Sequence, residues 1–150
     1  MAAALAWGVK QSFRSYVTGS GGSVRADAGA AEADDGFVFA ADGGDLAFDG
    51  EGRPRGTGRF RGALAFQAHG GLLSVSFSDP WVEAGPDGCV LSVADAGGRR
   101  VPFAKLDAAG AAVAADGAVT LPCAITLDGM MILGDHYPPG TVLDPVTVRI

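Results

Sequence analysis

The chain has few of the residues that usually carry catalytic or metal-binding chemistry. Its 150 residues include no Asn, only two His and only two Cys. Without Asn there is no N-glycosylation acceptor, and two isolated histidines do not form a cluster of zinc ligands. Charged residues make up only 19% of the chain, and the net charge is −6. An acidic domain repels a phosphate backbone, which argues against nucleic acid as a partner.

Long apolar runs and nucleophile motifs are also missing. No stretch reaches the roughly 18 to 20 apolar residues that span a membrane, and the apolar segment 1–9 lacks a basic n-region and a cleavage site. We therefore expect no membrane insertion, and either an intracellular protein or one domain of a longer exported, cell-surface protein. No Gly-x-Ser-x-Gly elbow is present, and nothing singles out a catalytic pair of carboxylates. We expect a binding protein and not an enzyme.

The two cysteines, Cys89 and Cys123, lie 34 residues apart in apolar, strand-like segments. This spacing is not that of a zinc site. A disulfide and two buried free thiols are both compatible with the sequence, and the apolar surroundings favour the thiols.

The chain is rich in apolar residues, which make up 48% of it, and its length suits a single domain over residues 1–150. Near the N-terminus, one stripe of a 3.6-residue period is formed by Leu5, Val9, Ser12, Phe13 and Tyr16. This stripe predicts a helix over the first 16 residues. We expect the helix to end near Thr18 and Gly19, with Gly19 in the left-handed conformation, and a flexible loop over 19–22.

From residue 37 onward, apolar residues alternate with polar ones. The predicted strands are 37–40, 46–48, 57–68, 72–78, 89–94, 101–106, 119–126 and 142–150. Asp-Gly occurs six times between apolar segments, which is typical of tight hairpins. The pattern predicts a mainly β fold, an antiparallel β-sandwich with an N-terminal short helix. A second short helix is expected near residues 128–133, with Asp128 as its N-cap.

Tyr16 is the most informative polar residue, because it ends the apolar stripe next to a Gly-rich segment. Its position alone is compatible with a core tyrosine bonded to the backbone, or with a ligand-binding tyrosine. His69 follows a predicted strand and precedes Gly70 and Gly71, where a solvated hairpin histidine is the simplest interpretation.

The segment Trp7-Gly8-Val9-Lys10-Gln11-Ser12-Phe13-Arg14-Ser15-Tyr16-Val17-Thr18-Gly19 closely resembles the opening of the HtaA family of haem-binding domains. These domains occur in haem-uptake proteins of the actinobacterial cell envelope. Three further segments match the family pattern in order and at suitable spacing: 58–80, 121–133 and 137–145. Together they cover most of the chain, and the N-terminal motif is the specific one.

The resemblance implies that Tyr16 is the axial ligand to the iron of ferric haem b, and that His69 hydrogen-bonds to its phenolate oxygen. It also places Ser12 and Phe13 among the cofactor-binding residues. Ferric iron favours a phenolate, and tyrosine is one of the known axial ligands of haem. The implied function is haem acquisition, transfer or buffering, with another haem carrier or receptor protein as partner. Donors for the haem propionates are expected from Ser12, Lys10 or Arg14.

The chain departs from the family pattern at two segments. Ser20 to Ser23 replaces a Pro-Ile-Ala-like segment, so we expect a more open pocket wall there. Asp135-His136-Tyr137 stands where the family has a Gly-Phe-Tyr-like run, and His136 is either a solvated loop residue or a second contact. Two other functions remain open. One is recognition of a glycan or protein through an exposed aromatic patch around Trp81, and the other is a haem-modifying enzyme with His136 as proton donor.

Overall fold

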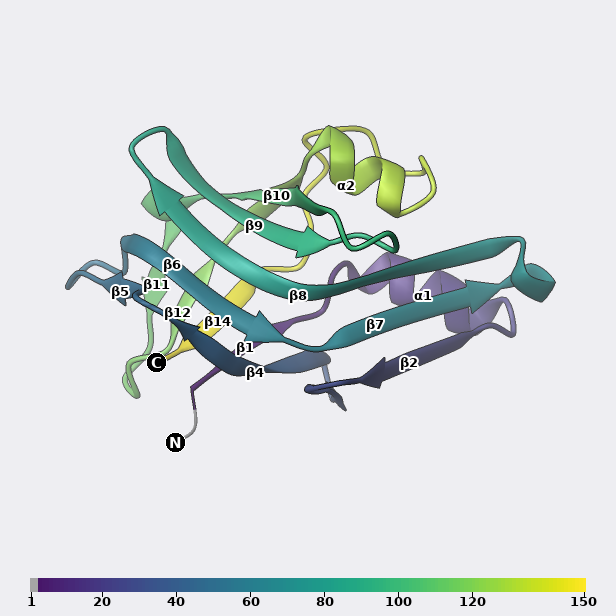
Figure 1. The fold of residues 1–150 in the computed structure, drawn as a ribbon, viewed down its shortest axis with the longest axis horizontal. Helices are drawn as coiled ribbons and strands as arrows, with labels where there is room; N and C mark the ends of the chain where they lie inside the picture. The colour runs from purple at the N-terminus through teal and green to yellow at the C-terminus, as the bar shows by residue number, and fades with distance from the viewer. Residues whose placement is uncertain (1–2) are drawn as a thin grey trace.

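The computed structural model describes residues 3–150 as one 14-stranded sheet that curls over two short helices (Figure 1). All pairings between named strands are antiparallel, so the predicted fold class is confirmed. The two layers of the expected sandwich are parts of one continuous sheet. Its main path runs β11-β12-β14-β1-β4-β6-β8-β9-β10-β13.

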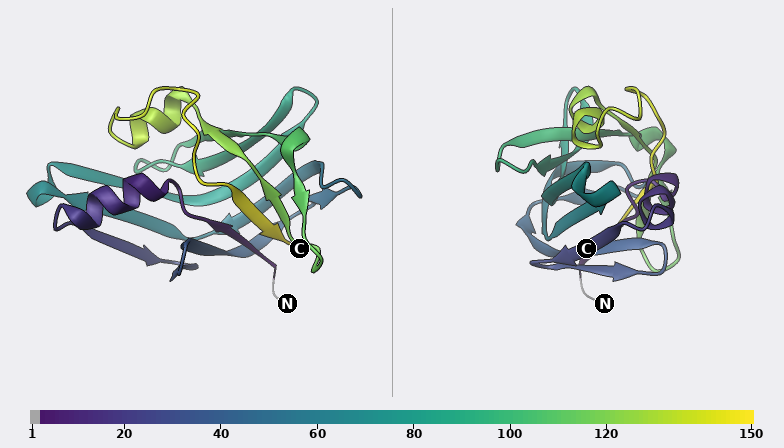
Figure 2. Two further views of the ribbon diagram at one scale, coloured as in Figure 1. Left: turned by 180° about the vertical axis from the view of Figure 1, so that it is seen from behind. Right: turned by 90° about the vertical axis from the view of Figure 1, so that its right-hand side faces the viewer.

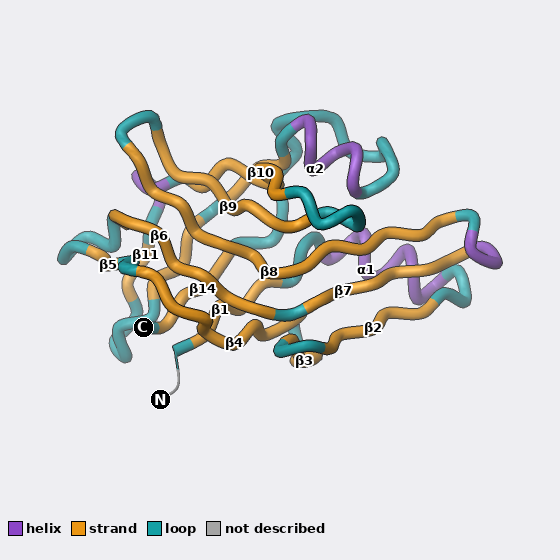
Figure 3. Tube along the Cα trace, viewed as in Figure 1, coloured by secondary structure: helices purple, strands orange, loops and turns teal. Residues whose placement is uncertain are grey.

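The elements alternate with short loops along residues 3–150 (Figure 3). The helices are α1 (Gln11–Gly19), α2 (Leu127–Ile132) and the 3₁₀ turns η1 (His69–Gly71) and η2 (Ala108–Gly110). The first strands are β1 (Ala4–Trp7), β2 (Ser23–Asp27), β3 (Ala30–Ala33), β4 (Gly36–Gly44), β5 (Ala47–Phe48), β6 (Pro54–Arg61) and β7 (Ala63–Ala68). The others are β8 (Leu73–Gly85), β9 (Gly88–Ala94), β10 (Arg100–Leu106), β11 (Ala112–Val113), β12 (Val119–Leu121), β13 (Cys123–Ile125) and β14 (Val146–Arg149).

Aromatic side chains from four strands form the centre of the core. The Trp7 ring on β1 meets Phe103 on β10 edge-on, with ring centroids 5.2 Å apart. The ring centroid of Phe77 on β8 lies 5.0 Å from that of Phe103 and 6.4 Å from that of Phe66 on β7. These contacts join opposite parts of the curled sheet, which Figure 2 shows from behind and from the side. Burial of such large rings supplies much of the stability of a sheet-on-sheet core.

The N-terminal helix is shorter than the 3.6-residue stripe predicts. Residues 4–7 form β1, which lies between β4 and β14, and the helix begins only at Gln11. Leu5 and Trp7 alternate with less buried residues, as they do in a strand buried on one face. Val9 then adopts a positive φ of 63°, which separates the strand from the helix.

Other elements also differ from the prediction in their bounds: the strand 119–126 divides into β12 and β13, 72–78 extends to Gly85, and 142–150 shortens to 146–149. The expected strand 57–68 divides at Gly62, whose φ of 145° suits glycine, and both halves pair with β8. Phe60, Leu64 and Phe66 are all buried, as their common face predicts. The second helix begins at Leu127, and its N-cap is Thr126 and not Asp128, because the Thr126 hydroxyl accepts the Gly129 N–H at 3.0 Å.

The cysteines are free thiols on strands that flank β10. Leu106 pairs with Cys89 on one side and with Cys123 on the other, so the two cysteines stand two strand spacings apart. That separation, about 9.5 Å, exceeds the reach of a disulfide. Burial raises the pKa of Cys89 to about 11 and that of Cys123 to about 12. In residues 3–150, no helix has both the length and the apolar character needed to cross a membrane.

Candidate functional site

Tyr16 and His69, which lie 53 positions apart in the sequence, meet at the surface. The Tyr16 hydroxyl oxygen lies 2.6 Å from His69 Nε2, and their ring centroids are 5.6 Å apart. Tyr16 is 44% exposed, although it belongs to the apolar stripe of α1. A short hydrogen bond between two such exposed rings fixes the direction of the phenol oxygen. The structure thus brings together the two residues that the family resemblance singled out.

Tyr16 stands at the edge of the buried face of α1. Phe13 and Val17 fill that face, and the Phe13 ring packs edge-on against Phe66 of β7 at 5.1 Å. Tyr16 is three positions after Phe13, so it projects beside this contact and stays half exposed. The helix therefore uses its core contacts to hold the phenol ring at the rim of the sheet.

Gly22 allows the end of α1 to approach β7 closely. A Cβ atom at this position would lie 2.1 Å from the carbonyl oxygen of Gln67 and 2.7 Å from that of Val17. The Gly22 N–H donates to the Val17 carbonyl at 2.9 Å, and the adjacent β2 pairs with β7. Within the segment expected to be an open, flexible wall, Gly22 is therefore packed against the strand that leads to His69, whereas Gly19, Gly21 and Ser23 are exposed. The left-handed residue after the helix is Gly21, with φ of 74°, and not Gly19.

His69 occupies a strained turn between β7 and β8. Its φ is 55°, an uncommon value for a residue other than glycine, and its carbonyl accepts the Leu72 N–H at 3.2 Å. Such conformations persist where surrounding structure imposes them, and they gather at functional sites. The turn directs the imidazole across to α1.

His136 contributes a third ring next to Tyr16. Their ring centroids are 6.3 Å apart, at a tilt of 55°. His136 lies in the loop after α2, where Asp135 also has a positive φ of 65°. The loop is held near β8, because a Cβ at Gly134 would lie 3.5 Å from both His136 and Leu73. His136 is therefore an exposed loop residue that also lies beside Tyr16.

The other expected cofactor-binding residues occupy different environments. Ser12 is exposed one turn before Tyr16, on the same side of α1. Phe13 is only 1% exposed, so its ring belongs to the core beneath the site. Lys10 Nζ donates to the Val142 carbonyl at 2.9 Å.

Arg14, one of the residues expected to supply a propionate donor, makes its contacts elsewhere in this structure. Its side chain lies on the opposite side of α1 from Tyr16, two positions away. Arg14 Nε donates to the Gly8 carbonyl at 2.8 Å, and Nη2 pairs with Asp144 Oδ2 at 3.2 Å. Arg14 anchors the helix instead.

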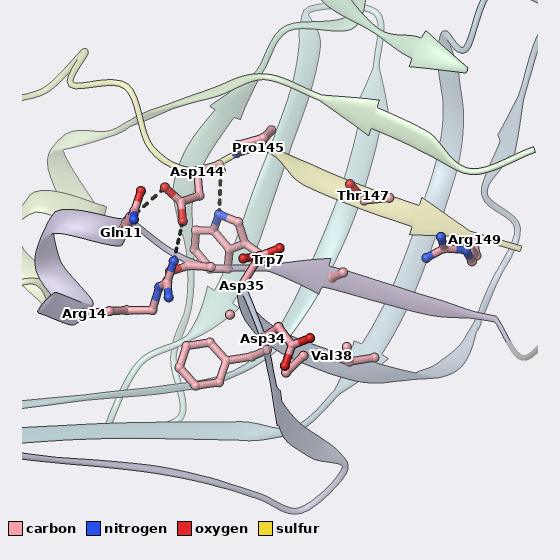
Figure 4. Close-up of a pocket in the computed structure, with 15 residues that line it drawn as sticks. Trp7, Gln11, Arg14, Asp34, Asp35, Val38, Asp144, Pro145, Thr147 and Arg149 are labelled. Carbon is pink, nitrogen blue, oxygen red and sulfur yellow. Dashed lines mark hydrogen bonds and ion pairs between the residues drawn. The ribbon is translucent and has the colours of Figure 1, made fainter. Parts of the chain in front are cut away.

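Asp144 is the centre of that anchor (Figure 4). Its Oδ1 accepts the N–H of Gln11, the first residue of α1, and its backbone carbonyl accepts the Trp7 indole N–H, both at 3.0 Å. Gly8 suits the close approach beside it, because a Cβ there would lie 2.7 Å from the backbone carbonyl oxygen of Asp35 and 2.3 Å from Asp144 Oδ2. A groove of about 770 Å³ is lined by these residues, on the Arg14 side of the helix and away from Tyr16.

Comparison with known proteins identifies the family of this fold. The HtaA family model, described as Htaa, matches residues 2–149. The chain belongs to the HtaA family. Comparison with curated protein sequences finds no match.

Solved structures of HtaA domains have the same fold. The C-terminal domain of HtaA from Corynebacterium glutamicum is 26% identical, with a TM-score of 0.77 over 97% of this chain and 93% of that one. The N-terminal domain of the same protein is 22% identical, with a TM-score of 0.78 over 100% and 97%. The haem-binding protein HtaB from the same organism is 17% identical, with a TM-score of 0.67 over 97% and 90%.

The environment of Trp81 does not match an exposed aromatic patch. The Arg100 guanidinium lies over its ring at 3.7 Å, and the Arg59 guanidinium lies 5.9 Å from the ring centroid. Trp81 itself is partly buried. The aromatic surface that would stack on a sugar is therefore occupied by arginine.

Sequence reasoning missed the residues that hold α1 in place. Asp144 and Gly22 act through contacts with residues far away in the chain, so no local pattern reveals them. The only available signal is that Asp144 falls within the segment 137–145, which matches the family pattern.

Proposed function

We propose that this member of the HtaA family binds ferric haem b, with Tyr16 as the axial ligand and His69 as the hydrogen-bond partner of its oxygen. The observation that carries the proposal is the 2.6 Å contact between Tyr16 Oη and His69 Nε2. Membership of the HtaA family and the fold shared with the haem-binding protein HtaB support it.

The surroundings of Tyr16 suit a flat, largely apolar ligand. Leu72, in the turn that carries His69, is 92% exposed, and Met131, next to the loop that carries His136, is 62% exposed. Both are exposed large apolar side chains on the segments that surround the phenol. Apolar surface of this kind around a few placed polar groups is typical of a small-molecule site.

The chemistry of the two side chains also fits. When ferric haem is bound, its iron supplies the Lewis acidity that stabilises a phenolate. Tyr16 then gives up its hydroxyl proton, and His69 Nε2 is the base within hydrogen-bond distance that can take it. The resulting imidazolium Nε2–H would donate back to the phenolate oxygen in a charge-assisted hydrogen bond. His69 thereby fixes the orientation of the ring and lowers the cost of ionising it.

The position of the site supports a role in carrying haem. One protein ligand at an exposed rim leaves the bound group accessible to a second carrier or receptor. We infer acquisition, transfer or buffering of oxidised haem, without chemical turnover of it.

The test is a visible absorption titration of the purified chain with ferric haem. We expect a Soret band that saturates at one haem per chain. Tyr16→Phe deletes only the hydroxyl and should remove the ligand-dependent spectrum. His69→Ala should weaken binding by about 10–100-fold, which is typical of the loss of a hydrogen bond to a metal ligand.

Tyr137→Phe is the matched control, because Tyr137 is the only other tyrosine and makes an edge-on contact with Phe13 at 6.3 Å. We expect its spectrum to equal that of the unmodified chain. A Tyr16→Phe variant with unchanged haem spectra would overturn the ligand assignment. A greater loss of affinity in His69→Ala than in Tyr16→Phe would make His69 the ligand.

A further inference from the structure

The arginines of this chain fall into two groups according to their partners. All nine lie within the described residues 3–150. Five of them form ion pairs with a carboxylate at 3.2–3.6 Å: Arg14, Arg25, Arg53, Arg99 and Arg149. The other four have no carboxylate oxygen within 4.0 Å among the described residues: Arg55, Arg59, Arg61 and Arg100. In a chain of net charge −6, four unpaired guanidinium groups are unexpected.

These four arginines share the outward face of neighbouring strands. On β6, Phe60 is buried while Arg55, Arg59 and Arg61 are exposed, so the three arginines project outward. Arg59 pairs across the sheet with Trp81 of β8. Arg100 reaches the same ring from β10. We name the set Arg55, Arg59, Arg61, Trp81 and Arg100 the arginine face.

Two guanidinium groups of the arginine face are held in place by Trp81. Arg100 lies 3.7 Å from the centre of the indole ring, and its Nη1 donates to Ser92 Oγ at 3.1 Å. The guanidinium carbon of Arg59 lies 5.9 Å from the centroid of the same ring. An arginine stacked on an aromatic ring keeps its N–H donors at the edge, in the planar geometry that matches a carboxylate, and Arg100 uses only its Nη1 on Ser92. The stacking therefore prepares the donors for an anionic partner.

We propose that the arginine face binds an acidic polypeptide segment of a partner protein. Arg59 and Arg61 are two positions apart on one strand, about 6.5–7 Å, which is the spacing of alternate side chains in an extended peptide. The carboxylates of Glu83 and Asp79 also lie near this region and interact electrostatically with the Arg100 guanidinium. They disfavour a continuous polyanion such as a lipid surface, whereas separated carboxylates can avoid them. Tryptophan and arginine are also the side chains most enriched at the centres of protein interfaces.

The arginine face lies far from the tyrosine–histidine pair. In Figure 1, β6 lies toward the left of the molecule, while η1, which carries His69, forms the right-hand tip. A partner bound to β6 therefore leaves Tyr16 accessible. The proposal does not depend on haem binding, so each can fail separately.

The probe is a capped ten-residue peptide of alternating glutamate and threonine, titrated into the ¹⁵N-labelled chain without haem. We expect chemical-shift changes in the β6 amides and in the Trp81 indole N–H, and weaker binding as salt is added. The variant Arg55→Gln/Arg59→Gln/Arg61→Gln should weaken binding by about tenfold or more. Its side chains are exposed, so the fold should persist.

The matched control is Arg25→Gln/Arg53→Gln/Arg99→Gln, which removes three exposed but paired guanidinium groups and changes the net charge equally. We expect this variant to bind the peptide as the unmodified chain does. An equal loss in the control, or no shift on β6, would overturn the proposal. It would also fail if vesicles of phosphatidylglycerol bound the arginine face and the peptide did not.

Discussion

Removal of the Asp144 side chain should loosen the helix that carries Tyr16. In Asp144→Ala, the Gln11 N–H at the start of α1 loses its acceptor, which costs about 1 kcal/mol for a helix N-terminus. The same change leaves Arg14 without its ion partner. The two side chains are only 22% and 25% exposed, so this pair is screened less than a surface pair, and its loss costs about 1–2 kcal/mol.

The expected total is a loss of about 2–3 kcal/mol in the free energy of unfolding. For a domain of this size, that corresponds to a decrease in Tm of about 5–10 °C. The loss should be visible in urea denaturation followed by circular dichroism, without a change in m-value. Asp144→Asn keeps an oxygen acceptor for Gln11 but removes the charge, so it should lose about half as much.

Glu51→Ala is the matched control, because the Glu51–Arg53 ion pair joins side chains that are 72% and 61% exposed. Its cost should stay below about 0.5 kcal/mol. A double-mutant cycle of Asp144→Ala with Arg14→Gln should give a coupling energy of about 1 kcal/mol. If Asp144→Ala cost no more than Glu51→Ala, the described role of Asp144 as the anchor of α1 would be refuted.

The remaining predictions concern the thiols and the third ring of the site. Burial raises the pKa of Cys89 to about 11 and of Cys123 to about 12, so neither should react with iodoacetamide at pH 8 until urea unfolds the chain. Because the thiols of the unfolded chain release their protons at lower pH than the buried thiols do, the free energy of unfolding should decrease above about pH 9. If iodoacetamide labelled the native chain as fast as the unfolded chain, the burial of the two thiols would be contradicted. His136→Ala should change stability by less than about 0.5 kcal/mol and weaken haem binding less than His69→Ala, as measured by the same titration. If His136→Ala weakened haem binding more than His69→Ala did, His136 and not His69 would be the hydrogen-bond partner of Tyr16.

The residues of the site were easier to predict than the elements that carry them. Tyr16 and His69 stand in segments that resemble a known family, and the structure places their polar atoms in contact. The local pattern could not separate strand from helix over residues 4–9, because Leu5 and Val9 fit both periods. Pairing with β4 and β14, which are distant in the sequence, decides in favour of a strand at residues 4–7.

Other structural features also depend on long-range contacts or lack a local sequence signal, so the sequence did not predict them. Strands β2 and β3 are mostly exposed and carry few large apolar residues. The alternation of β2 rests only on Val24 and Ala26, which stay partly exposed, and β3 has no alternation, so neither gives a clear strand signal. Gly22 and Asp144 matter only because distant backbone comes within van der Waals or hydrogen-bonding distance. Such contacts form only when segments far apart in the sequence are brought together by the fold, so no local sequence pattern predicts them.

The pairing of β1 with β14 also affects how the protein is made. The ribosome synthesises Tyr16 well before Asp144. The N–H of Gln11, the first residue of α1, nevertheless donates its hydrogen bond to the Asp144 side chain. A nascent chain therefore carries the tyrosine for most of its synthesis without the anchor that positions the helix. The helix that carries Tyr16 therefore gains its full support only after residues 144–149 have emerged.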